Sequence, residues 1–224
     1  MLKLALPARP LPLPLAALAA LALPAPRPST APTAAPAAPA GSAQSRLRYV
    51  VAPTGNEARY RVRERLVGRD LDNDVVGVTK DVSGRLVVEA NGRVIADSSR
   101  IVVQAATLAT DQTRRDNYVR RRTLETEKYP TIELVPTTFA GISAPIPAGA
   151  SRTFALTGNL TIHGVTRPTT WQVTARADGA AAAGTAKTSF TFRDFTLDQP
   201  RVPIVLSVAD TLRLEYDFRF TPAR

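Results

Sequence analysis

Few side chains in this sequence are suited to covalent or metal chemistry. The 224 residues include one histidine, His163, and no cysteine. The lack of thiols excludes disulfides, thiolate metal sites and cysteine nucleophiles, and one imidazole cannot build a histidine-based metal site within one chain. A Ser–His–Asp arrangement would have to use His163, which stands in the turn-like segment "HGVTRP". We therefore expect a turn residue whose ring bonds to nearby backbone, and we expect no catalytic residue and no metal site.

The acidic residues offer little more. Asp116 follows Arg115, and Asp194 follows Arg193, which favours local ion pairs or helix caps over acid–base catalysis. Glu64 is the exception, because it falls on the apolar face of its predicted strand. Two interpretations are open for it: a position at a bend or rim, or a contact with the polar headgroup of a ligand.

The chain is strongly basic, with a net charge of +10, and 25 of its 29 basic residues are arginine. Such a surplus favours anionic partners such as phospholipid headgroups, phosphates or nucleic acid. The densest cluster of basic residues comprises Arg114, Arg115, Arg120, Arg121 and Arg122. Two interpretations are open for it: a solvated face, or a surface that meets lipid phosphates near a barrel mouth. No recognition-helix pattern or RNA-binding aromatic motif accompanies it, so we expect no nucleic acid and name an anionic membrane surface as the expected contact.

The first 45 residues are predicted to lie outside the folded domain. Residues 1–23 have a basic start followed by an apolar run from Leu11 to Leu23, which indicates a secretory signal peptide. Residues 24–45 are rich in alanine, proline, serine and threonine, which is typical of a disordered linker. The folded domain then spans residues 46–224, with a net charge of +7, and we expect it to be periplasmic or extracellular. A disordered tail on a cytoplasmic protein is the alternative.

From residue 46 onward the hydrophobic pattern has a period of two. The segment "EARYRVRERL" places Ala58, Tyr60, Val62 and Leu66 on one face and a row of four arginines on the other. The same alternation appears in "SRTFALTGNLTIHG", "TTWQVTARAD", "AKTSFTFRDF" and "TLRLEYDFRF". This pattern predicts half-buried β-strands.

Less regular strands are predicted for residues 47–52, 75–90 (bent near Gly84), 98–106 and 131–139, and a short helix for 113–123. Hydrophobic residues make up 44% of the chain, enough for a packed core. The total is eight or nine antiparallel strands, which close into a barrel or fold as a two-sheet sandwich. Aromatic-rich faces and strands of about ten residues favour an all-β barrel of about eight strands. The interior of such a barrel is either filled by side chains or holds one small ligand.

The apolar rows of these strands supply the residues predicted to face the interior. They either pack a dry core or line a cavity for an apolar molecule. The candidate ligand-binding set is Tyr60, Val62, Phe154, Leu156, Leu160, Ile162, Trp171, Val173, Phe190, Phe192, Leu212, Leu214, Tyr216 and Phe218.

Three segments resemble the YceI-like family, the lipocalin-like polyisoprenoid-binding proteins of bacterial envelopes. In "RRDNYVRRRTLETEKYPTIEL" the matching residues are Arg115, Asp116, Tyr129, Pro130 and Thr131. In "GNLTIHGVTRPTTWQV" they are Gly158, Leu160–Val165, Thr166 and Pro168, and "FTFRDF" is a looser match. The resemblance covers residues 48–221.

The resemblance implies a lipocalin-like barrel that holds a long isoprenoid lipid, of the polyprenyl or quinone type, in its lumen without a cofactor and without catalysis. Two alternatives stay open. One is a structural or stress-protective envelope protein with a filled core, and the other is an enzyme that uses the barrel as its pocket.

Overall fold

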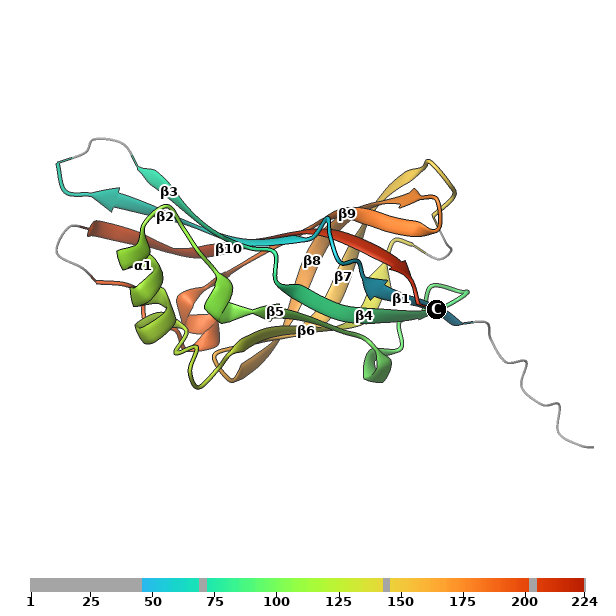
Figure 1. Cartoon of the computed structure of the whole chain (residues 1–224), viewed down its shortest axis with the longest axis horizontal. Helices are drawn as coiled ribbons and strands as arrows, with labels where there is room; N and C mark the ends of the chain where they lie inside the picture. The colour runs from blue at the N-terminus through green and yellow to red at the C-terminus, as the bar shows by residue number, and fades with distance from the viewer. Residues whose placement is uncertain (1–45, 69–71, 143–145, 202–204, 224) are drawn as a thin grey trace, which may run out of the picture. The chain divides into compact units, whose positions relative to one another are not determined.

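The structure, a computed structural model, describes residues 46–68, 72–142, 146–201 and 205–223. The predicted signal peptide (1–23) and linker (24–45) lie outside the described residues. The described chain is mainly one antiparallel sheet that closes on itself (Figure 1). The alternation seen in the sequence thus forms strands, as predicted.

The ten strands are β1 (Arg46–Val51), β2 (Glu57–Leu66), β3 (Asn73–Thr79), β4 (Val82–Glu89), β5 (Arg100–Gln104), β6 (Thr131–Ala140), β7 (Ser151–Ile162), β8 (Val165–Asp178), β9 (Ala181–Thr191) and β10 (Val205–Pro222). The helical segments are short. They are α1 (Thr113–Tyr118), which continues as the π-helical turn η3 (Val119–Thr123), and the 3-10 turns η1 (Ala96–Ser98), η2 (Ala105–Thr107) and η4 (Phe192–Phe195).

These ten segments build a barrel with eight strand positions. The chain 46–66 pairs along its length with the chain 73–89, so β1 with β2, and β3 with β4, each act as one interrupted strand. The sheet then runs from β4 through β5, β6, β7, β8 and β9 to β10, and β10 pairs with both β1 and β2 to close the ring. The predicted barrel of about eight strands is confirmed, and the sandwich alternative is wrong.

The interruption between β1 and β2 is held by one side chain. Asn56 donates from Nδ2 to the Ala52 carbonyl at 2.7 Å, and its Oδ1 accepts from the Tyr216 hydroxyl at 2.9 Å and the Arg219 amide at 3.0 Å. Residues 53–56, "PTGN", therefore form a kink inside one long strand and not a hairpin turn. Since Asn56 is buried, these bonds also satisfy a polar group that would be costly to leave unpaired.

Two predicted boundaries were wrong. The bend predicted near Gly84 lies instead at residues 80–81, between β3 and β4, where the Asp81 amide bonds to the Thr79 hydroxyl. The strand predicted through "AKTSFTFRDF" ends at Thr191, because the next four residues turn into η4. The Asp194 carboxylate accepts bonds from the Thr191 amide and hydroxyl, and this capping box ends the strand.

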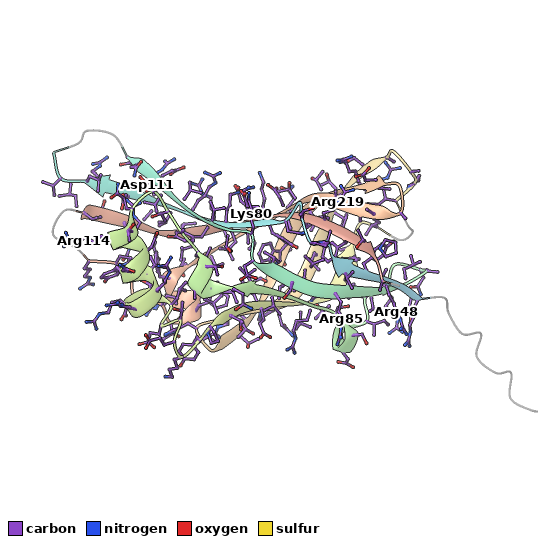
Figure 2. All side chains as sticks on the ribbon, in the orientation of Figure 1. Arg48, Lys80, Arg85, Asp111, Arg114 and Arg219 are labelled. Carbon is purple, nitrogen blue, oxygen red and sulfur yellow. The ribbon has the colours of Figure 1, made fainter. Side chains whose placement is uncertain are left out.

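At one end of the barrel three strands extend past β9. β10 pairs with β9 from Thr211 onward, whereas its first residues, from Val205 to Val208, pair with β2. We call β2, β3 and this first part of β10 the arm. Figure 1 shows the arm facing α1 and η4 across the end of the barrel, and α1 is joined to it through the Val78–Ala109 bridge that precedes the helix. Side chains with nitrogen and oxygen tips project from the outside of the barrel (Figure 2).

Candidate ligand-binding cavity

The interior of the barrel contains a cavity of about 1160 Å³. Small-molecule sites usually measure roughly 300–1,000 Å³, so this one is large. All fourteen residues predicted from the sequence to face the interior line it: Tyr60, Val62, Phe154, Leu156, Leu160, Ile162, Trp171, Val173, Phe190, Phe192, Leu212, Leu214, Tyr216 and Phe218. That they bind a ligand remains a prediction, but the structure brings every one of them to a single cavity.

Strand register explains why these side chains converge. In an antiparallel sheet, residues directly opposite each other point to the same face. Leu212 pairs with Val62 on one side and with Phe190 on the other, so three predicted residues from three strands form one row. Leu156 pairs with Trp171 in the same way. Further rows form in the same way because each strand from β5 to β10 pairs with the next.

Aromatic rings lie along the wall and leave the lumen open. The ring of Tyr60 covers Gly77, its register partner on β3, and a Cβ at position 77 would overlap the ring. Phe218 stands opposite Gly184 in a similar arrangement. The Trp171 indole donates to the Thr169 hydroxyl at 2.9 Å, which satisfies its only polar atom. The described wall is therefore mostly apolar.

Polar groups gather where α1 meets the arm. Glu64 on β2 is only 6% exposed, and its Oε1 accepts from Arg115 Nη2 at 3.0 Å and from Asn73 Nδ2 at 3.2 Å. Glu64 therefore does lie at one end of the barrel, inside the cavity wall, with its charge matched by an arginine from the helix. A buried carboxylate needs such a partner to remain ionised without a large cost.

Tyr216, which is buried, and Tyr60, which is half-buried, both line the cavity. Burial, together with the nearby Asp116 carboxylate, raises the pKa of Tyr60 to about 12. Burial also raises the pKa of Tyr216, whose hydroxyl donates to Asn56. Both phenols are neutral near pH 7, so each is able to donate a hydrogen bond.

His163 is a turn residue, as predicted, but its partner is different. It lies between β7 and β8 with a φ of 51°. Its Nε2 bonds to the Glu125 carboxylate at 3.0 Å instead of to backbone, and its ring meets Tyr129 edge-on with 4.5 Å between centroids. This contact ties the hairpin tip to the chain that leaves η3.

Asp116 has a local structural role, as predicted, but not the ion pair with Arg115 that was one of the two roles expected for it. Asp116 accepts from the amide and hydroxyl of Thr110, which closes the turn before α1, while Arg115 bonds to Glu64 and Asp111. The arginine cluster also divides. Arg114, Arg121 and Arg122 are exposed, whereas Arg115 and Arg120 turn inward, and Arg120 donates to the Leu108 carbonyl. Figure 2 shows Arg114 and Asp111 at this end.

Several lining residues were not named from the sequence. Some lie on the irregular strands, where a period of two would have identified them: Leu47, Tyr49, Leu86, Val88, Ile101, Val103, Ile132 and Leu134. Others come from the helical segment that covers the end of the barrel, such as Arg115, Tyr118 and Val119. No local pattern predicts which strand end a short helix covers.

Within the described ranges, no group of three or more His, Asp or Glu side chains is placed to hold a metal ion. Among the same residues, no helix is both long enough and apolar enough to cross a membrane.

Solved structures with this fold include proteins from three organisms. BcnA of Burkholderia cenocepacia superimposes with a TM-score of 0.56 at 18% identity, over 75% of this chain and 98% of that one. A polyisoprenoid binding domain from Saccharophagus degradans, implicated in plant cell wall breakdown, gives 0.58 at 13% identity, over 79% and 99%. The Campylobacter jejuni YCEI protein gives 0.55 at 17% identity, over 71% and 91%. No curated protein matches the chain.

The sequence profile of the YceI-like domain matches residues 49–220, nearly the whole of the described barrel. The chain therefore belongs to the YceI-like family.

Proposed function

We propose that this barrel binds and carries a long-chain isoprenoid lipid, of the polyprenyl or quinone type, and that it catalyses no reaction. The observation that carries the proposal is the cavity of about 1160 Å³ with apolar walls from every side of the barrel. Family membership supports it, and so does the likeness to a domain described as polyisoprenoid binding.

The physical chemistry of an apolar lumen suits such a ligand. Burying one five-carbon unit is worth roughly 3–4 kcal/mol before costs, at about 0.8 kcal/mol per methylene. Association costs about 4–15 kcal/mol, so a chain of several units binds without any strong polar contact. A core plugged by its own side chains would have no room for the tail, and the cavity argues against that alternative.

We further propose that the protein acts outside the cytoplasm and contacts anionic lipid surfaces. The basic and then apolar start of the chain, and the surplus of arginine, support this view.

Extraction tests the proposal directly. Protein purified without detergent is extracted with organic solvent, and the extract is analysed by mass spectrometry for compounds with a repeating five-carbon mass increment. The stripped protein is then offered a polyprenyl lipid. We expect an extractable isoprenoid, or saturable uptake of the added one, and protein that carries nothing and takes up nothing would overturn the proposal.

A further inference from the structure

The cavity has a polar end and an apolar end. At the end covered by α1, its lining includes Glu64 and Asn73 from the arm and Arg115 from the helix. At the far end, the β8–β9 hairpin contributes alanine and glycine, Ala177 and 179–182, and aromatic residues stand nearby. Glu89 and Arg176 also line the far end, but the Glu89 carboxylate is already bonded to Arg93 and Arg176 is exposed to solvent. A lipid with one polar end therefore has one favoured orientation.

At the polar end of the cavity, some hydrogen-bond donors have no protein acceptor. Arg115 has five N–H donors. Three of them serve Glu64, Asp111 and Thr110, at 3.0, 2.6 and 3.4 Å. Its Nε and its second Nη2 hydrogen have no protein acceptor within the described part of the chain.

The Tyr60 hydroxyl is a second donor of this kind. The tyrosine lines the cavity, and no described residue accepts a hydrogen bond from it. Tyr60 lies on the same face of β2 as Glu64, and both line the cavity, while Asp116 and Arg115 are close enough to influence the pKa of its phenol. Since buried polar groups are normally paired, a free donor on a cavity wall points to a ligand acceptor.

A third unpaired group lies in the same wall. Thr123, on η3, is 6% exposed, and its Oγ1 has no hydrogen-bond partner among the described residues. Thr123 is also one of the lining residues. Two segments far apart in sequence, β2 and the α1–η3 helix, thus present unsatisfied polar atoms at one end of an otherwise apolar chamber.

The charged side chains that line the cavity at this end balance, because Arg114 and Arg115 stand with Glu64 and Asp111, two of each sign. A phosphate would add a charge of roughly −1.5 to −2 beside those carboxylates, and this part of the lining has no net positive charge to match it. An uncharged oxygen needs only a donor.

We infer that the polar end of the lipid lies beneath α1, where an uncharged oxygen, a quinone carbonyl or a polyprenol hydroxyl, accepts hydrogen bonds from Tyr60 and Arg115. The tail then extends toward the β8–β9 hairpin. This inference rests on the proposed function and adds the class of head group and its direction.

The test is a binding panel with one tail and four heads. Stripped protein is titrated with an isoprenoid quinone, a polyprenol, a polyprenyl monophosphate and the plain polyprenyl hydrocarbon, all with tails of equal length. We expect the quinone and the polyprenol to bind more tightly than the other two. Tyr60→Phe removes one hydroxyl and should weaken those two about 3- to 10-fold, as for one hydrogen bond, while leaving the hydrocarbon unchanged.

Tyr129→Phe is the matched control, because Tyr129 is not among the residues that line the cavity. It should change none of the four affinities. Tyr49→Phe tests the far end of the cavity, which Tyr49 lines. A second variant, Glu64→Gln with Arg115→Gln, removes both charges together, so that neither is left buried and unpaired. It should also weaken binding of the quinone selectively.

Each other outcome has a distinct meaning. Loss of quinone binding in Tyr49→Phe, but not in Tyr60→Phe, would place the head at the wrong end and overturn the inference. Tightest binding of the monophosphate would overturn the uncharged head. Equal affinity for all four lipids in every variant would remove the head site but leave the lumen as a binding site. Binding of none would overturn the proposed function itself.

Discussion

The ring of Tyr60 on β2 lies directly over Gly77 on β3, and the two are paired in register. Because glycine has no Cβ, the ring rests against the wall instead of crossing the lumen. The width of the cavity at this level thus depends on a residue that contributes no side chain. The same pair also positions the Tyr60 hydroxyl, which we propose donates a hydrogen bond to the head group of the lipid.

Adding a side chain at Gly77 should therefore narrow the cavity. In Gly77→Val the new side chain overlaps the Tyr60 ring, so the ring must swing into the lumen. We expect a loss of about 1–3 kcal/mol in the free energy of unfolding, as for other overpacked sites, and a marked fall in lipid uptake. Urea denaturation and the extraction assay measure the two effects.

A double variant serves as the control. Gly77→Val combined with Tyr60→Ala removes the ring that would be displaced, so uptake of the plain hydrocarbon should recover. If the double variant binds no better than Gly77→Val alone, the overlap is not the cause.

Because the pKa values of Tyr60 and Tyr216 are raised in the folded protein, we expect a loss of stability at alkaline pH. Burial raises the pKa of Tyr60 to about 12 and raises that of Tyr216 as well, whereas an unfolded tyrosine ionises near about 10. A group with a raised folded pKa contributes stability that is fully present below the unfolded pKa and lost as the pH rises through the folded pKa. The free energy of unfolding should thus fall from about pH 10 upward.

Absorbance of tyrosinate at 295 nm measures this ionisation. In the folded protein, Tyr60 and Tyr216 should ionise late, and Tyr60→Phe and Tyr216→Phe should each remove one late step. Early ionisation of all five tyrosines in folded protein, verified by circular dichroism, would contradict the burial of these two phenols.

Arg59 joins the outer faces of β2 and β10. It bonds to Glu57 and Asp217 at 2.7 Å each and to Glu215 at 3.3 Å. We expect Arg59→Met to cost about 1–3 kcal/mol in the free energy of unfolding at pH 7, because three carboxylates lose a shared partner. Arg65→Met is the control. Its side chain is 50% exposed, against 17% for Arg59, so its single pair with Asp72 should contribute about 0–1 kcal/mol.

The effect of Arg59 should also depend on pH. Burial opposes ionisation of Asp217 and Glu215, yet bonds to Thr185, Arg59 and Arg61 bring both pKa values below the usual range. Groups with a lowered folded pKa stabilise above the unfolded pKa, near about 4, and lose that contribution as the pH falls through the folded pKa. The difference between wild type and Arg59→Met, measured by urea denaturation, should therefore shrink below pH 4; a constant difference would rule out ionisation of these carboxylates as its cause.

Two glycines with the same backbone conformation isolate the contact at the His163 turn. Gly164 and Gly149 both have a φ of 74°, but a Cβ at 164 would press on the Tyr129 ring, whereas a Cβ at 149 would meet nothing within 4 Å. Gly149→Ala should cost about 1–2 kcal/mol for the left-handed conformation alone. Gly164→Ala should cost more, since Tyr129 must also leave His163. Equal shifts in the urea midpoint would show that the Tyr129 contact contributes nothing.

Export predicts a processed N-terminus. Protein recovered from outside the cytoplasm should have an intact mass below the 24.0 kDa of the full chain, consistent with removal of residues 1–23. Intact-mass measurement and N-terminal sequencing provide the check. Full-length protein found only in the cytoplasm would contradict the proposed location.

Most of the fold could be predicted because each strand is amphipathic by itself. The alternation in residues 57–66 and 211–220 fixes which side chains face inward, and the cavity lining agrees. One error came from a local contact that the alternation hides, because Asp194 bonds back to Thr191, caps η4 and ends β9. The kink at residues 53–56 depends instead on a contact from outside its segment, since Asn56 bonds across to Tyr216.

Composition and a period of two thus determined antiparallel strands with one apolar face and one polar face rich in arginine, and they favoured a barrel over a sandwich without deciding between them. The tertiary structure alone decided that the interior is hollow, that α1 covers one end, and that Arg115 meets Glu64 across 51 positions of sequence. The reason is physical. The pattern of a strand by itself decides on which face of the sheet each of its side chains lies. The space between opposite walls, and the partner of a buried charge, depend on residues that are brought together only when the sheet closes.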